Sequence, residues 1–365
     1  MGFTCGIVGL PNVGKSTLFN ALTSAGAEAS NYPFCTINPN VGIVTVPDAR
    51  LDQLGKIHGV QSLIHTTIEF VDIAGLVRGA SKGEGLGNQF LSHIREVDAI
   101  AHVVRCFDNA NVAHVDGSVD PSRDIEVVET ELLLKDLETV EKKLQDIHKH
   151  SKSGERKARV DEAILTKVRD YLASGRHART VDVVGEEESS VYREMHLLTA
   201  KTVLYVCNVN ESEIGKENAY VKSVRSIAQG EGAGVVVVSA EVEAEIAELP
   251  TEERKQFLEG IGLRSSGLER VIREGYALLR LVTFFTANDK EVRAWTVRRG
   301  THAPAAAGVI HSDFERGFIR AEVAKFADIS RLGSVQAVRD QGLLHIQGRD
   351  YLVEDGDLIL FRFNV

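Results

Sequence analysis

Short apolar runs alternate with helical spacing along much of the chain, a pattern typical of a parallel sheet covered by helices. Residues 6–9 form an apolar, β-branched run, and similar runs recur at residues 66–75, 99–107, 201–207 and 234–238. Each run is short enough to be a single buried strand. The pattern therefore predicts an α/β domain that is built from separated parts of the sequence.

In residues 125–171 the apolar residues repeat with a different spacing. Apolar residues step by alternating four and three positions, which is the spacing of a heptad seam; they are Leu133, Leu137, Val140, Leu144 and Ile147. The pattern breaks at residues 149–159, where Gly154 lies among five basic residues, Lys149, Lys152, Arg156, Lys157 and Arg159. We expect an antiparallel helical hairpin with a positive tip, either a contact for phosphate or a solvated turn. An acidic loop is expected at residues 181–191.

The end of the chain changes to strand-like patterns. Residues 243–258 and 268–279 have helical spacing, and residues 281–287 then begin a β-rich unit. Its later strands are expected at residues 322–326, 343–347 and 357–365. This unit is a compact C-terminal module without a catalytic group.

The first strand leads into a phosphate-binding motif. Gly9-Leu10-Pro11-Asn12-Val13-Gly14-Lys15-Ser16 fits the pattern G-x-x-x-x-G-K-[ST] at every position. Two glycines let the backbone amides of residues 12–17, including those of Asn12, Val13, Gly14 and Thr17, surround an anion at a helix N-terminus. We expect Lys15 to reach the β- and γ-phosphates and the Ser16 hydroxyl to bind Mg²⁺.

Two further segments have the spacing of nucleotide-dependent switches. Thr36 lies in a loop about twenty residues after the P-loop, where a threonine contributes to binding Mg²⁺ and the γ-phosphate. Asp72-Ile73-Ala74-Gly75 ends a strand, so we expect Asp72 to hold Mg²⁺ through water and the Gly75 amide to meet the γ-phosphate. Residues 79–88 form a glycine-rich second switch. Together these segments predict a molecular-switch NTPase.

The residue after Gly75 changes the expected chemistry. Leu76 occupies the position where Ras-type switches carry a glutamine that orients water, and a leucine makes no hydrogen bond. His114, in the loop after the strand at 99–107, is a candidate for this role, although a loop histidine is more often a bystander. His102 lies within that strand and is expected to be a core residue.

The next strand leads to a base-recognition candidate. Asn208-Val209-Asn210-Glu211 stands where guanine-specific switches carry Asn-Lys-x-Asp, so the lysine and the aspartate are both replaced. Their replacement weakens the preference for guanine and favours adenine. Ser239-Ala240-Glu241 follows the strand at 234–238, where a loop borders the base.

Composition narrows the class of protein. With 365 residues, 43% of them hydrophobic, the chain is long enough for two or three domains, and it contains no run of about 18 apolar residues. We expect no signal peptide and no membrane segment. Four scattered cysteines predict buried thiols in a reducing, cytoplasmic compartment, and the net charge of −10 argues against a protein that coats DNA.

With these motifs in place, the chain resembles the Obg-like ATPase (YchF) family of P-loop switch proteins along its whole length. The likeness rests on the phosphate, switch and base motifs and on a C-terminal segment similar to a TGS domain, including residues 313–322. The resemblance implies a Ras-like G domain interrupted by an antiparallel helical coiled coil and followed by a β-grasp TGS domain. It also implies ATP preferred over GTP, a cytosolic protein associated with ribosomes, translation and stress responses, and a histidine loop that replaces the glutamine.

The expected domains are residues 1–124 and 195–279 for the G domain, 125–194 for the helical insert and 280–365 for the TGS domain. The expected function is slow, Mg²⁺-dependent ATP hydrolysis by a monomeric switch, with Lys15 and His114 as catalytic residues and Ser16, Thr36 and Asp72 at the metal. The alternatives are a GTPase of translation or ribosome assembly, and a ribosome- or RNA-binding factor in which hydrolysis resets the state.

Overall fold

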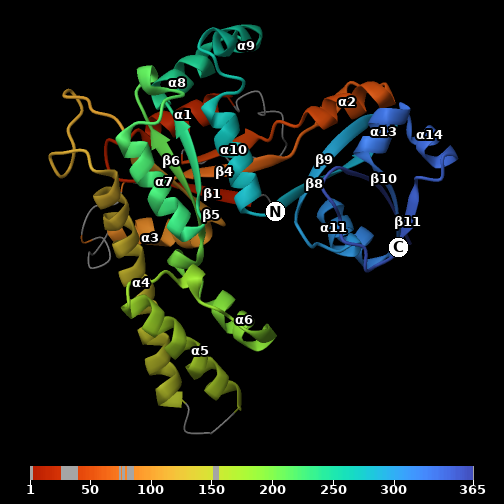
Figure 1. The fold of residues 1–365 in the computed structure, drawn as a ribbon. Coiled ribbons are helices and arrows are strands. Elements are labelled where there is room, and N and C mark those ends of the chain that lie inside the picture. The colour runs from red at the N-terminus through yellow and green to blue at the C-terminus, as the bar shows by residue number, and fades with distance from the viewer. Residues whose placement is uncertain are drawn as a thin grey trace.

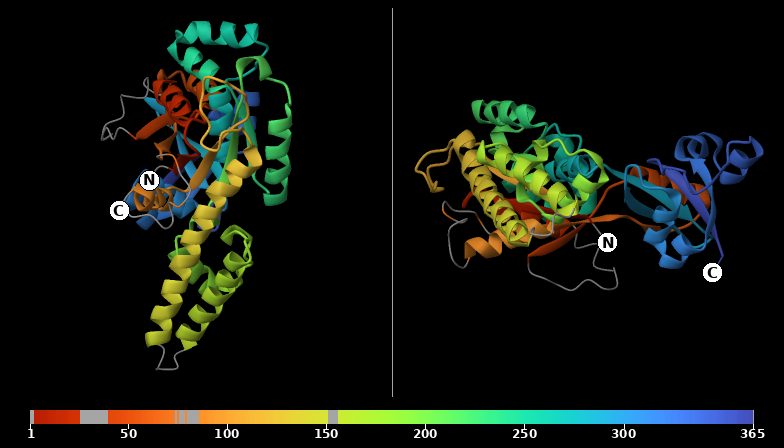
Figure 2. Two further views of the ribbon diagram at one scale, coloured as in Figure 1. Left: turned by 90° about the vertical axis from the view of Figure 1, so that its left-hand side faces the viewer. Right: turned by 90° about the horizontal axis from the view of Figure 1, so that it is seen from below.

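The computed structural model describes residues 3–25, 40–73, 75, 79, 86–150 and 156–364. Within these residues the strands form two six-stranded sheets. A helical hairpin projects from the first sheet, and the second sheet lies to one side of it (Figures 1 and 2). The predicted fold class, an α/β domain with a P-loop, an inserted helical hairpin and a β-rich C-terminal unit, is confirmed.

The first sheet has the strand order β2-β4-β1-β5-β6-β7 and is parallel except for β2, which runs antiparallel to β4. Its strands are β1 (Phe3–Val8), β2 (Val41–Thr45), β4 (Thr67–Asp72), β5 (Ala99–Arg105), β6 (Thr202–Asn208) and β7 (Gly234–Val238). The helices around it are α1 (Lys15–Ala25), α3 (Leu86–Glu96), α7 (Ala219–Glu231), α8 (Ala240–Glu248), α9 (Thr251–Gly260) and α10 (Gly267–Leu278).

The central strands explain why their sequences are so uniformly apolar. β5 is buried along its whole length because helices cover both faces of the sheet. The run expected to be one helix at 243–258 is instead two helices, α8 and α9, because Pro250 separates them. The carboxyl ends of β1, β4, β5, β6 and β7 lead into the loops that carry the candidate site residues.

The inserted hairpin consists of α4 (Pro121–His150) and α5 (Arg156–Ala173). The predicted heptad seam is confirmed, since Val140 and Leu144 are buried against α5 and the other seam residues pack around them. The expected loop at 181–191 is wrong: α6 (Gly185–Glu194) occupies most of it, with Val191 packed into the hairpin core. Of the basic tip, Lys152 lies outside the described residues, whereas Arg159 is exposed on α5. Two short turns of helix, η3 (Ala178–Thr180) and η4 (Leu198–Ala200), lie between the hairpin and β6, and a third, η5 (Glu211–Glu213), follows β6.

The second sheet has the strand order β11-β10-β12-β8-β9-β3. Its strands are β3 (Ser62–Ile64), β8 (Leu281–Ala287), β9 (Glu291–Arg298), β10 (Phe318–Lys325), β11 (His345–Gln347) and β12 (Asp357–Phe363). Its helices are α2 (Ala49–His58), α11 (Ala303–Ile310), α12 (Ser312–Arg316), α13 (Phe326–Leu332) and α14 (Val335–Asp340).

One segment of the first half of the chain belongs to the second sheet. β3 pairs in parallel with β9, and Leu51 and Leu54 of α2 are fully buried beside Phe285 and Val292. The sequence assigned residues 1–124 to the nucleotide-binding domain, but residues 49–64 pack with the C-terminal unit. The chain therefore passes between the two units three times: from β2 to α2, from β3 back to β4, and from α10 to β8.

Among the described residues, no helix combines the length and the apolar character needed to cross a membrane.

Candidate functional site

The P-loop between β1 and α1 has a backbone that encloses a small concavity. Gly9 and Gly14 have φ angles of 155° and 97°, and Asn12, a residue that tolerates the left-handed region, has φ 63°. A Cβ at Gly9 would lie 2.4 Å from the Val103 carbonyl oxygen, so only glycine fits there. This alternation of backbone conformations turns successive amides toward one point and creates an anion-binding nest.

Two charged groups face this loop without strong partners. Lys15 is only 7% exposed, and its Nζ donates to the Leu10 carbonyl oxygen at 3.0 Å. Burial lowers the pKa of Lys15 and raises that of Asp72, although each charge partly offsets the effect on the other. Asp72 Oδ2 lies 3.5 Å from the Ser16 hydroxyl, and its Oδ1 is buried with no hydrogen-bond partner. Hydroxyl and carboxylate oxygens of this kind suit a hard cation such as Mg²⁺.

The switch segments are described only in part. Gly75 lies beside the P-loop, since a Cβ there would be 3.2 Å from Lys15 Nζ and 3.4 Å from Pro11. Thr36 and Leu76 lie outside the described residues. The amide of Gly79 donates to Glu131 Oε1 on α4 at 2.7 Å. The first residue of the predicted second switch is therefore bonded to the helical insert.

Asn208, at the end of β6, connects the P-loop to the base loop. Its Nδ2 donates to the Val13 carbonyl oxygen at 2.9 Å, and its Oδ1 accepts from the Ala240 amide at 2.9 Å. A Cβ on Gly14 would lie 2.3 Å from this Nδ2, so the glycine leaves room for the contact. Both polar atoms of the Asn208 amide thus bond within the protein, and the side chain holds the P-loop against the start of α8.

The remaining base-loop candidates divide into buried and exposed groups. Val209 and Ala240 are buried, and the Ser239 hydroxyl is buried without a hydrogen-bond partner. Glu211 and Glu241 are exposed at the start of η5 and α8. A bound base can supply the hydrogen-bond partner that the Ser239 hydroxyl lacks.

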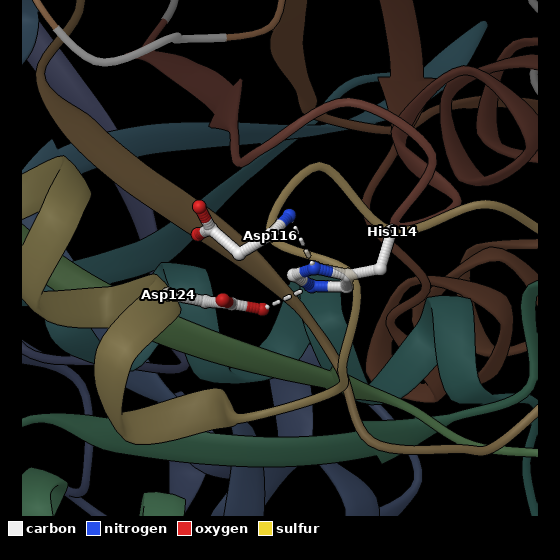
Figure 3. A group of neighbouring side chains, drawn as sticks. All are labelled: His114, Asp116 and Asp124. Carbon is white, nitrogen blue, oxygen red and sulfur yellow. Dashed lines mark hydrogen bonds and ion pairs between the residues drawn. The ribbon is translucent and has the colours of Figure 1, made fainter.

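His114 points toward the first turn of α4 (Figure 3). The Asp116 amide donates to its Nδ1 at 3.1 Å, so Nε2 carries the proton and donates to Asp124 Oδ2 at 2.9 Å. The side chains of His114 and Asp124 are only 4% and 3% exposed. Both ring nitrogens are therefore engaged. The loop itself reaches the P-loop, since Asn12 Nδ2 donates to the Ala113 carbonyl oxygen at 3.3 Å.

The structure adds a positioning residue that the sequence analysis did not select. Arg105, at the end of β5, is 2% exposed, and its guanidinium donates to the carbonyl oxygens of Phe107, Asn109 and Val112 at 3.0–3.1 Å. These three bonds shape the start of the loop that carries His114. A charged residue inside an apolar run was the available signal, because a buried arginine needs partners.

Comparisons with known proteins place both units of the chain in described families. The family model described as a 50S ribosome-binding GTPase matches residues 4–149. The model of the YchF GTPase C-terminal domain, described as a protein of unknown function (DUF933), matches residues 281–364. The match is to a C-terminal YchF domain and does not itself identify a TGS domain.

Relatives cover the chain from end to end. The Bacillus subtilis (strain 168) protein named ribosome-binding ATPase YchF is 53% identical, and the Escherichia coli O157:H7 protein of the same name is 54% identical. Each alignment covers 100% of both chains. The solved structure of the Schizosaccharomyces pombe YchF GTPase is 38% identical, covers 99% of this chain and 98% of its own, and has a TM-score of 0.88. The chain belongs to the YchF family.

Proposed function

We propose that this protein is an ATP-hydrolysing molecular switch that works with the ribosome. The observation that carries the proposal is a set of polar atoms gathered around one loop and left without full partners: Lys15 Nζ, Asp72 Oδ1 and Ser239 Oγ. Buried polar atoms of this kind are rare unless a ligand completes them. A nucleotide with its cation offers a phosphate, a metal and a base to these three positions. The names of the relatives support the same function.

Mg²⁺ fits the oxygen ligands at this site. We assign the Ser16 hydroxyl and Asp72 to the metal, together with Thr36, which lies outside the described residues. When bound, the metal neutralises charge on the phosphates. Lys15 and the amides of residues 12–17 bind the phosphate oxygens, and the Gly75 amide responds to the γ-phosphate. Lys15 can leave the Leu10 carbonyl for a phosphate because a bond from its ammonium group to a neutral carbonyl is weaker than one to an anionic phosphate.

His114 is our candidate for orienting the attacking water, since Leu76 cannot do so. In the conformation described above, the imidazole is bonded to Asp124 and to the Asp116 amide. We propose that ATP binding releases it toward the nucleotide. This requirement predicts slow intrinsic turnover, because the competent conformation must first be reached.

We propose that the base is adenine. Both polar atoms of the Asn208 amide already bond to the protein, so the base contacts other groups. We propose that it meets Ser239 and the Ala240 region, with the exposed Glu211 and Glu241 at the rim of the site. Val209 is buried and offers no lysine stem to pack on the base. A longer acid at Glu211 is poorly suited to the two adjacent donors of guanine. The alternative is a GTPase with the same phosphate machinery.

The test compares binding and turnover in one series. Calorimetry with Mg²⁺ should show tighter binding of ATP than of GTP. His114→Ala should lower the rate of ATP hydrolysis by about 100-fold, the usual contribution of a positioned acid or base, with ATP affinity nearly unchanged. His345→Ala, which changes an exposed histidine in β11, is the control. Tighter GTP binding would favour the GTPase, and an unchanged rate would remove His114 from the reaction.

We propose that the positive hairpin tip and the C-terminal unit, which we take to be a TGS domain, form the surface for the ribosome. The alternative is a factor whose output is ribosome or RNA binding, with hydrolysis as the reset. Reversing the charges of Lys149, Lys152, Arg156 and Lys157 should release the protein from ribosomes during co-sedimentation at physiological salt. Reversing the exposed residues Lys255 and Arg264, which lie away from the tip, is the control. Co-sedimentation that survives the reversal would exclude the tip as the contact.

A further inference from the structure

A second cavity lies where the two units meet, away from the P-loop. It has a volume of about 500 Å³ and is bounded by α10, by the first residues of α2 with the segment before them, and by the start of β8 with the neighbouring loops of the second unit. This volume is within the range of sites that bind small molecules. Four arginines line it: Arg50, Arg273, Arg280 and Arg299.

Arg50 already has its partners. Its guanidinium bonds Asp48 at 2.7 Å and Asp355 at 2.6 Å. These two aspartates and Glu269 are the acids that line the cavity. Four arginines against three acids leave the lining with a net positive charge, in a chain whose net charge is −10. Two of the three acids are directed to Arg50, so the other arginines keep their positive charge available.

The other three arginines are open to a ligand. Arg273, Arg280 and Arg299 are exposed, and within the described part of the chain their guanidinium groups make no hydrogen bond or ion pair. They come from three segments: Arg273 from α10, Arg280 from the connection to β8, and Arg299 from the turn after β9. Guanidinium groups converging on one cavity match phosphate oxygens, because each can donate two parallel hydrogen bonds.

The backbone of Arg280 gives an independent indication. Its φ is 53°, in the left-handed region, immediately after the end of α10, where glycine is the usual residue. An arginine in this conformation costs about 1 kcal/mol relative to glycine. The Arg280 carbonyl oxygen accepts from the Arg299 amide at 2.7 Å, so the two residues are held together. Because glycine would be more stable at position 280, we expect the Arg280 guanidinium to have a function.

We propose that this cavity binds a small anion with more than one phosphate group, either inorganic pyrophosphate or the diphosphate of a nucleotide. Arg273, Arg280 and Arg299 bind the phosphate oxygens. Because Arg273 belongs to the first unit and Arg299 to the second, the bound anion fixes one unit relative to the other. The site is separate from the nucleotide site proposed above and does not depend on its chemistry.

The test uses the full chain with the P-loop first saturated by Mg²⁺ and a non-hydrolysable ATP analogue, whose own binding is measured separately. Calorimetric titration with pyrophosphate, and in a second arm with uridine diphosphate, should reveal one further site. Stronger binding in the second arm identifies a nucleotide as the source of the diphosphate. Arg273→Ala and Arg299→Ala should each raise the dissociation constant about tenfold, as expected for one lost charged hydrogen-bonding group.

Arg280→Gly separates a binding role from a structural one. Glycine adopts a φ of 53° without strain, so this variant should unfold at a higher temperature and still bind pyrophosphate about tenfold more weakly. Arg264→Ala removes an exposed arginine outside the cavity and should leave the titration unchanged. The proposal is overturned if no further site is found, or if binding survives in the combined Arg273→Ala and Arg299→Ala variant.

Discussion

Two lysines, one in each unit of the molecule, have opposite surroundings: Lys15 is buried, whereas the side chain of Lys325 is 33% exposed. Lys15 in the P-loop has a single hydrogen bond, to the Leu10 carbonyl oxygen, and the nearby Asp72 keeps one oxygen without a partner. Lys325 at the end of β10 donates to Asp357, Glu354 and the Tyr351 hydroxyl at 2.7–3.0 Å. The other oxygen of Asp357, a fully buried residue, accepts from the Tyr351 hydroxyl and the Glu354 amide.

The pKa directions follow these contacts. Burial lowers the pKa of Lys15, whereas hydrogen bonds to Asp357, Tyr351 and Glu354 overcome the opposing effect of burial and raise the pKa of Lys325. A buried charge with few hydrogen-bond partners favours the binding of a ligand that supplies them. A charge whose partners come from the protein itself stabilises the fold. The two clusters therefore distinguish a binding site from a structural ion pair, although both are built from lysine and aspartate.

Lys15→Met tests the first half of this comparison. It should reduce ATP turnover by about 1000-fold, because the transferred phosphate loses a charged partner in a water-poor site. The free energy of unfolding without nucleotide should change by less than about 1 kcal/mol, since only one bond to a neutral carbonyl is lost. Turnover and urea unfolding are measured on the same preparation. A large loss of stability would show that the lysine is structural.

Lys325→Met tests the second half. It leaves the fully buried Asp357 without its cation, so the protein should lose roughly 3 kcal/mol of stability. ATP turnover per folded molecule should stay close to that of the unmodified protein, since Lys325 lies in the second unit. Urea unfolding followed by tryptophan fluorescence suits the experiment, because the single tryptophan, Trp295, lies in the same sheet. Full stability in this variant would contradict the assignment of Lys325 to a structural pair.

Much of the nucleotide unit was predictable because its signals are local. The P-loop, the strand that ends in Asp72 and the heptad seam were each encoded within a few residues, and the structure has them at those positions. α6 was missed because its first turn is acidic and lacks apolar spacing, although acidic residues are favoured at a helix N-terminus.

Contacts between distant parts of the chain were not predictable in this way. The pairing of β3 with β9 joins segments more than two hundred residues apart, and α2 alone gives no sign of which unit it covers. His114 could be proposed from its position in a loop, but its bond to Asp124 depends on how the loop folds onto α4. Arg105 could be noticed as a charge inside an apolar run, but the three carbonyl groups that it bonds leave no pattern in the sequence.

His102 extends the comparison to a buried group that is most stable without charge. It is 2% exposed in β5 with its ring 5.5 Å from that of Tyr205, and burial lowers its pKa to about 4 despite the opposing charge of Glu129. Above pH 6.5 neither the folded nor the unfolded state binds this proton. As the pH falls from 6.5 toward 4 the unfolded state gains the proton first, so stability falls.

His102→Phe should remove this contribution. Between pH 7 and pH 5 the variant should lose about 2 kcal/mol less of its free energy of unfolding than the unmodified protein, as a pKa difference of this size requires. Urea unfolding across this pH range gives the comparison, and His345→Phe, at an exposed position, should retain the full pH dependence. Equal slopes for the His102 variant and the unmodified protein would mean that His102 takes up its proton inside the folded core. The core of the first unit would then tolerate a buried charge, and the single neutral partner of Lys15 would no longer identify a ligand site.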